Sequence, residues 1–231
     1  DKPAAAAAAA RGKAAVGEGS GVVTLEQVEA VLGPVKFDAP KDRALQVSKP
    51  GVAIGLAYTP FGGDVLYIEA SKMGGSGQVT ITGQLGDVMR ESAQAALSLV
   101  KARAETLGIE QERLDKSDIH IHVPAGAIKK DGPSAGVALY TALVSLLTDR
   151  KVKNDVAMTG EISLRGQVMP IGGVKEKTIA AQRAGVTHLV FPKANERDWN
   201  ELPDNLREGL TAHFAGHYSD VYEVAFPADA K

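Results

Sequence analysis

The chain has 231 residues, of which 44% are hydrophobic and 23% charged, and its formal net charge is −2. This composition is typical of a globular domain with a sizeable core. The balanced charge gives no case for a nucleic-acid partner. Cysteine is absent, which excludes disulfides, thiolate metal sites and cysteine nucleophiles. No apolar run is long enough to span a bilayer, so we expect no membrane partner.

The N-terminal part is not expected to contribute to a core. Residues 1–20 carry an alanine run without the large apolar side chains of a signal peptide, so we interpret them as a flexible arm, a linker or a cloning remnant. Residues 22–34 predict a short helix, because Thr24 and Gln27 fit a capping box and a Gly-Pro pair ends it. The polar stretch 37–49 predicts a linker.

Strands and helices alternate along the rest of the chain. Strands are predicted at 52–58, 65–70, 78–82, 118–123, 156–159, 167–169 and 188–191, with glycine turns at 62–63 and 74–75. Helices are predicted at 87–106, 134–148, 174–184 and near 220–224; the second is apolar on nearly every side and therefore buried. The alternation indicates a mixed α/β or α+β layered fold.

The serine of KKDGPSAG, Ser134, is the first candidate functional residue. Gly132 and Pro133 impose a tight turn before it, and the following helix offers free N–H groups and a positive dipole end that would stabilise an anion. The alternative is that Ser134 only caps that helix. A nucleophilic serine would need a base.

The lysines of GGVKEKT supply a candidate base. On a helix over 174–184, Lys177 is flanked by Val174, Ala180, Ala181 and Ala184, whereas Lys175 faces a mixed, mostly polar side. Burial without a carboxylate would lower the lysine pKa from about 10.4 towards roughly 7–8, where an amine can act as a general base. The alternative is a lysine whose amine reaches solvent while its stem packs.

The sequence also bears on a metal site and a phosphate site. His120 and His122 share one face of a strand, but no third metal ligand lies at a telling spacing, so a structural role is preferred over a metal site. Glu176 stands where a P-loop requires glycine, and its charge would repel phosphate, so we exclude an ATP site in GGVKEKT.

Three stretches together resemble the proteolytic domain of the Lon ATP-dependent proteases. They are HIHVPAGA at 120–127, KDGPSAG at 130–136 and DVAMTGEISLRGQVMPIGGVKEK at 155–177. The resemblance covers roughly residues 45 to 227 and implies a catalytic dyad of Ser134 and Lys177. The helix-face argument selects the same lysine.

The resemblance also implies supporting residues. Thr159 matches a threonine that hydrogen-bonds the lysine, Glu161 and His122 match an interacting pair near the site, and Asp131 shapes the serine loop. Gly132, Pro133 and Ala135 form the turn beside the oxyanion. Ala125 and Lys129 depart from the family pattern, which has glutamate and proline there, so loop conformation or substrate contacts would differ.

The implied fold is α+β, like the second domain of ribosomal protein S5. The implied activity is that of a serine endopeptidase acting on unfolded polypeptides, as part of a homohexameric ring in protein quality control. The chemistry needs no cofactor; ATP and Mg belong to an AAA+ module that this chain lacks. We expect a bacterial cytoplasmic location, with the mitochondrial matrix as the alternative.

The implied organisation is an arm over 1–20, a remnant of the AAA+ small helical subdomain with its linker over 21–44, the proteolytic domain over 45–227 and a tail over 228–231. Two rival functions are a non-catalytic assembly or nucleic-acid module of the same fold, and a small-molecule kinase. The retained serine and lysine argue against the first rival, and the lack of a convincing phosphate-cradling loop argues against the second.

Overall fold

The computed structural model describes residues 23–33, 49–59, 62–124, 131–226 and 228. The predicted arm, nearly all of the predicted linker, and the departures at Ala125 and Lys129 lie outside the described residues. The chain divides into two compact units, residues 1–38 and 39–231. In the first unit, helix α2 spans Leu25–Leu32, and the predicted capping box of Thr24 and Gln27 is present.

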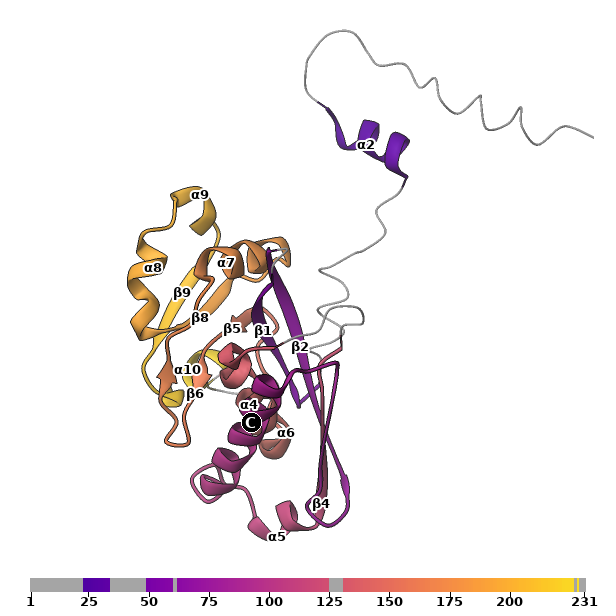
Figure 1. Ribbon diagram of the computed structural model, residues 1–231, viewed down its shortest axis with the longest axis vertical. Helices are drawn as coiled ribbons and strands as arrows, with labels where there is room; N and C mark the ends of the chain where they lie inside the picture. The colour runs from indigo at the N-terminus through magenta and orange to yellow at the C-terminus, as the bar shows by residue number, and fades with distance from the viewer. Residues whose placement is uncertain (1–22, 34–48, 60–61, 125–130, 227, 229–231) are drawn as a thin grey trace, which may run out of the picture. The chain divides into compact units, whose positions relative to one another are not determined.

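The second unit is built on a seven-stranded sheet in the order β3-β4-β2-β1-β5-β8-β9 (Figure 1). β1 is antiparallel to β2, and β2 to β4, whereas the pairs β3–β4, β1–β5, β5–β8 and β8–β9 are parallel. The strands are β1 (Val52–Thr59), β2 (Gly62–Gly74), β3 (Val79–Thr82), β4 (Ser117–His122), β5 (Val156–Met158), β8 (His188–Pro192) and β9 (Thr211–Ala215). A separate hairpin pairs β6 (Glu161–Ile162) with β7 (Val168–Met169).

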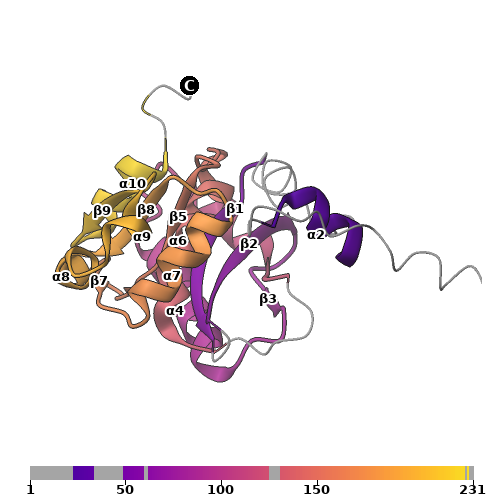
Figure 2. The same cartoon turned by 90° about the horizontal axis from the view of Figure 1, so that it is seen from above.

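Helices cover both faces of this sheet. They are α4 (Asp87–Ala102), α5 (Gln111–Asp115), α6 (Gly136–Thr148), α7 (Val174–Arg183), α8 (Glu196–Asn200), α9 (Asp204–Arg207) and α10 (Tyr218–Ala225), with 3₁₀ turns η2 (Pro133–Ala135) and η3 (Lys193–Asn195). Within β1, Ala53 belongs to the core that includes α4, α6 and α10, and Ile54 to the core beneath α7. Because alternate residues of a strand point to opposite faces, α7 lies across the sheet from α6. Figure 2 shows α7 beside β1 and β2, against which it packs. The predicted mixture of helices and sheet is confirmed.

Several predicted boundaries were wrong. The expected turn at Gly62–Gly63 is the start of β2, where these glycines pair with Thr59 and Tyr58. The strand predicted at 188–191 extends to Pro192, which is its last residue and pairs with Ala215 where a missing N–H is tolerated. β9 and α5 were not predicted, because β9 is a short edge strand with weak alternation and α5 is barely longer than one turn.

Candidate active site

Ser134 lies in a 3₁₀ turn rather than at the cap of an α-helix. The turn η2 begins after Gly132, whose φ of 143° suits glycine, and has Pro133 at its start. The N-cap of α6 is Ala135, with no side-chain capping hydrogen bond. The capping alternative for Ser134 is therefore wrong, because the extra turn moves the start of α6 beyond it.

The carbonyl oxygen of Ser134 ties its turn to the end of β5. It accepts a hydrogen bond from the Gly160 N–H at 2.8 Å and a second from Thr159 Oγ1 at 3.1 Å. The Val137 N–H in turn donates to the Gly160 carbonyl at 3.0 Å. These reciprocal bonds hold the start of α6 against the strand end from which the β6–β7 hairpin departs.

Asp131 connects the other side of the serine turn to α4. Its Oδ1 accepts a hydrogen bond from the Met89 N–H, in the first turn of α4, at 3.2 Å. A carboxylate is favoured at a helix N-terminus, where N–H groups lack partners within the helix. Gly86 allows this contact, since a Cβ there would lie 2.2 Å from the Asp131 carboxyl carbon. Asp131 therefore anchors the loop that leads to Ser134.

Lys177 is buried on α7, and Lys175 is exposed, as the helix-face argument predicted. The Lys177 side chain is only 1% exposed, and its Nζ donates to Thr159 Oγ1 at 3.0 Å. Helix α7 starts after Gly173, which has φ of 73°, a conformation that favours glycine. The alternative of a lysine reaching solvent is wrong.

The burial of Lys177 changes its acid–base behaviour. Loss of solvation lowers the pKa of its amine from 10.5 to about 8, because the charged form is disfavoured away from water. With a pKa of about 8, roughly a tenth of the amine is unprotonated at pH 7, far more than for an ordinary lysine. An amine in that form has a lone pair with which it can accept a proton.

Thr159 joins the serine turn to the lysine. It is fully buried, and its Oγ1 accepts from Lys177 Nζ while lying 3.1 Å from the Ser134 carbonyl and 3.4 Å from the Leu56 carbonyl. Ser134 Oγ is not a hydrogen-bond partner of Lys177 Nζ among the described residues. A direct Ser134–Lys177 bond would thus require a local movement, which is common in catalytic sites without substrate.

One cavity brings Ser134 and Lys177 together although 43 residues separate them in sequence. Its volume is about 470 Å³, and both residues line it. The remaining lining residues are Tyr58, Asp131, Pro133, Pro170, Ile171, Gly172 and Gly173. Sequence reasoning missed Tyr58, Pro170 and Ile171; the adjacency of the last two to GGVKEKT was the only available signal. The cavity places a hydroxyl and a buried amine beside an apolar wall.

The predicted partners Glu161 and His122 are not brought together. His122 Nδ1 and His120 Nε2 both hydrogen-bond Thr82 Oγ1, at 2.7 and 2.9 Å. Glu161 lies in β6, paired with Met169, and the described residues show no hydrogen bond or ion pair between Glu161 and His122. Over the described part of the chain, no cluster of three or more histidine or acidic side chains suits a metal ion.

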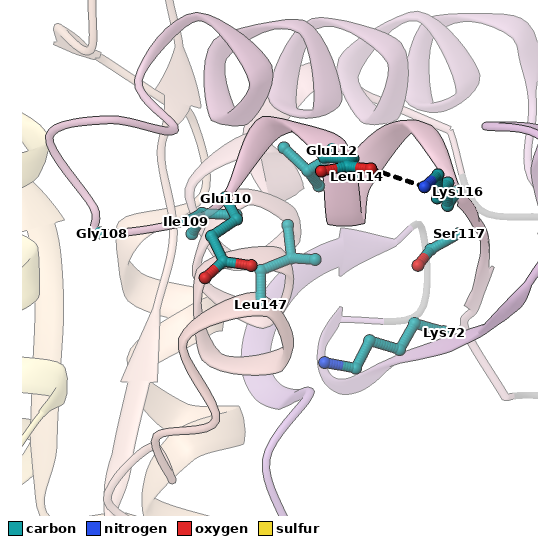
Figure 3. A pocket seen from close by; sticks show the side chains of 9 residues that line it. All are labelled: Lys72, Gly108, Ile109, Glu110, Glu112, Leu114, Lys116, Ser117 and Leu147. Carbon is teal, nitrogen blue, oxygen red and sulfur yellow. Dashed lines mark hydrogen bonds and ion pairs between the residues drawn. The ribbon is translucent and has the colours of Figure 1, made fainter.

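A second cavity of about 530 Å³ lies apart from this site (Figure 3). Lys72 of β2, residues around α5 and Leu147 at the end of α6 line it. On its rim, Lys116 pairs with Glu112 at 2.6 Å, and both side chains are largely exposed. Among the described residues, this cavity shares no lining residue with that of Ser134 and Lys177.

Comparison with known proteins first defines the class. Residues 22–228 match the family of the Lon protease (S16) C-terminal proteolytic domain. The Lon protease of Methylocella silvestris is 55% identical over 88% of this chain and 25% of its own length. That of Desulfosudis oleivorans is 52% identical over 95% of this chain and 27% of its own length. Lon protease 2 of Thermus thermophilus is 53% identical over 90% of this chain and 26% of its own length.

The chain belongs to the Lon protease C-terminal proteolytic domain family. It spans about a quarter of the length of the curated relatives it matches. Among the helices in the described ranges, none has the length and apolar character needed to cross a membrane.

Proposed function

We propose that this chain is a serine endopeptidase domain in which Ser134 is the nucleophile and Lys177 the general base. The observation that carries the proposal is the burial of Lys177, 1% exposed, in the cavity that Ser134 also lines. Among the described residues Lys177 forms no ion pair with a carboxylate, and burial lowers the pKa of its amine. A buried amine without a counter-ion is costly to maintain, which favours a functional reason for it.

In the proposed reaction, neutral Lys177 takes the proton of Ser134 Oγ as that oxygen attacks a peptide carbonyl. Ser134 Oγ must first come within about 2.6–3.2 Å of Lys177 Nζ. The N–H groups of the turn around Gly132, Ser134 and Ala135 are proposed to stabilise the oxyanion, whereas Pro133 has no N–H to offer and shapes the turn. Charged Lys177 then protonates the leaving amine, and water repeats the sequence on the acyl-enzyme.

Supporting roles are proposed for three further residues. Thr159 orients the Lys177 amine through their 3.0 Å hydrogen bond, and Asp131 holds the serine loop at the N-terminus of α4. Pairing of Glu161 with His122 remains a prediction that this conformation does not display. If the pair forms, a rearrangement or a second copy of the chain must supply the contact.

The wider biological role is also proposed. Relatives that match this chain are named Lon protease, which supports unfolded polypeptide substrates, a homohexameric ring and a bacterial cytoplasmic location. We propose that the fold has the topology of the second domain of ribosomal protein S5 and that the proteolytic domain spans residues 45–227, after an arm over 1–20 and a helical remnant with its linker over 21–44, and before a tail over 228–231. We also propose that ATP and Mg are used by a separate AAA+ module. The peptidase chemistry itself uses no cofactor.

The dyad is tested with an unstructured fluorogenic peptide. Ser134→Ala and Lys177→Ala should each abolish turnover, while the exposed Lys175→Ala, two positions away on the same helix, should retain it. Circular dichroism should report an unchanged fold. Activity persisting in Lys177→Ala would transfer the base role to another residue.

Two assays address the role beyond the dyad. A peptide boronate should label wild-type protein and not Ser134→Ala; absence of labelling together with nucleic-acid binding would instead favour the non-catalytic module.

The chain should cleave unstructured peptides without ATP and leave folded proteins largely intact. ATP-stimulated degradation of a folded protein would contradict the assignment of ATP use to a separate module.

A further inference from the structure

We propose that His217 is a positioning residue for the peptidase site, because its imidazole fastens the turn of the β6–β7 hairpin. The inference rests on the proposed function of Ser134 and Lys177. His217 touches neither of them. It acts through a hairpin that begins at the strand end holding the Ser134 turn and returns to the wall of their cavity.

The two ring nitrogens of His217 have different partners that require the same tautomer. Nε2 lies 3.2 Å from the carbonyl oxygen of Arg165, which can only accept, so Nε2 must carry the proton. Nδ1 accepts the Ser219 N–H at 3.2 Å. The neutral Nε2–H imidazole satisfies both contacts at once, so one side chain joins the hairpin turn to the N-terminus of α10.

Backbone contacts show how closely the hairpin turn fits this helix start. The Tyr218 N–H donates to the Gly166 carbonyl at 2.8 Å, and the Val168 N–H donates to the Gly216 carbonyl at 3.0 Å. Gly166 has φ of 84°, a conformation that favours glycine, and a Cβ there would lie 2.7 Å from His217 Nε2. The exposed His217 ring therefore lies directly over the turn.

Both arms of the hairpin lead into the site. The first arm, β6, directly follows Thr159 and Gly160, which hydrogen-bond the Ser134 carbonyl. The second arm, β7, leads to Pro170 and Ile171, which line the cavity of Ser134 and Lys177. A hairpin free to tilt at its turn would move both arms, and small displacements of catalytic groups reduce rate strongly.

Two substitutions separate the Nε2 contact with Arg165 from the Nδ1 contacts, which are with the Ser219 N–H and, at 3.1 Å, with Ser219 Oγ. His217→Asn places an amide oxygen near the position of Nδ1, so it keeps the helix cap but cannot reach Arg165. His217→Gln places an amide N–H near the position of Nε2, so it keeps the Arg165 contact and loses the cap. Each variant is measured for thermal stability, for peptide turnover, and for hydrogen exchange of the Gly166 and Gln167 amides.

The proposal expects opposite outcomes from the pair. His217→Asn should keep its Tm, lower kcat by about tenfold with little change in KM, and exchange the hairpin amides faster. His217→Gln should lose roughly 2–4 °C in Tm and retain turnover below its Tm. Full activity in His217→Asn, or an equal loss of activity in both variants, would overturn the positioning role.

If the proposed peptidase function of Ser134 and Lys177 is wrong, the wild-type protein shows no peptide turnover that depends on Ser134. The hydrogen-exchange rates then decide the proposal alone: faster exchange in His217→Asn supports the fastening of the hairpin, and unchanged exchange rejects it.

Discussion

The Thr159 hydroxyl has a single proton and two neighbouring carbonyls. Since its oxygen accepts from Lys177 Nζ, its proton goes to one carbonyl, and the Ser134 carbonyl is closer than that of Leu56, at 3.1 against 3.4 Å. The hydrogen bonds therefore run in one direction, from lysine to threonine to the serine backbone. With one N–H committed to Thr159, the rotation of the Lys177 amine and the direction of its lone pair are restricted.

Thr159→Val keeps the shape of this side chain but removes the acceptor. We expect kcat for peptide cleavage to fall by about tenfold or more as the amine loses its orientation, with KM little changed. Thr159→Ser should retain most activity. Thr178→Val is the matched control, since this buried threonine of α7 donates to its own helix at Val174; an equal kinetic loss there would argue against a specific role of Thr159.

The lowered pKa of Lys177 makes activity and stability depend on pH in defined directions. Turnover should rise as pH increases through about 8, where the amine becomes neutral. Below pH 8 the folded protein carries an unfavourable buried charge on Lys177. In the unfolded chain the lysine keeps its proton up to its ordinary pKa of 10.5. The contribution of Lys177 to the free energy of unfolding therefore rises as the pH increases from about 8 to 10.5.

Lys177→Met should therefore be inactive yet more stable at pH 7, by about 1–3 kcal/mol. Urea unfolding at pH 7 and pH 10 measures this difference, which should shrink at the higher pH. A variant that is less stable than wild type at pH 7 would contradict an uncompensated buried amine.

At the scale of elements, α7 is positioned by its close contact with the first residues of β2. A Cβ on Gly63 would lie 2.0 Å from the Glu176 carbonyl oxygen, so the two backbones approach too closely for any side chain. Glu176 directly precedes Lys177. The start of β2 therefore sets the height of α7, and with it the position of the amine, above the sheet.

Gly63→Ala should force β2 and α7 apart. We expect the free energy of unfolding to drop by about 1–3 kcal/mol and peptide cleavage to weaken as Lys177 shifts. Gly74→Ala, at the other end of the same strand, meets no atom within 4 Å and serves as the control. Equal behaviour of the two variants in denaturation and peptide assays would show that the close approach is unimportant.

The edge strand β9 carries a second pH-sensitive element. His213 Nε2 lies 3.0 Å from His188 Nδ1, and burial, His188 and Lys153 lower the pKa of His213 below 6.5. As the pH falls, His213 is protonated in the unfolded chain before it is protonated in the folded protein. The free energy of unfolding should therefore fall as the pH drops through 6.5 towards the lower pKa of His213 in the folded protein. His213→Asn should flatten this part of the stability profile; an unchanged slope in denaturation measured from pH 7.5 to 5 would refute it.

Sequence patterns predicted the elements that carry local signals and missed those defined by distant contacts. The capping box of α2 and the buried side of α7 follow from residues within one or two helical turns. The role of His217 depends on Arg165, 52 residues away, and the start of β2 on the backbone of Glu176. Spacing along the chain carries no record of such contacts.

For the molecule as a whole, the residues around the candidate site come from widely separated parts of the 39–231 unit. The contact of Thr159 with Leu56 spans 103 residues, and that of Met89 with Asp131 spans 42. Parallel neighbours such as β1 and β5 are also distant in sequence. Contacts of this kind form slowly in folding, because a long loop must close first.

The order of synthesis then gives the burial of Lys177 a further consequence. Ser134 leaves the ribosome before Lys177, whose amine has its full basicity, and is almost wholly protonated near neutral pH, until α7 packs against β1 and β2. A partly made chain thus holds the serine without a usable base. On the proposed mechanism, the newborn polypeptide, itself an unfolded chain of the kind this domain is proposed to cut, meets a serine whose proposed base stays protonated until α7 has packed.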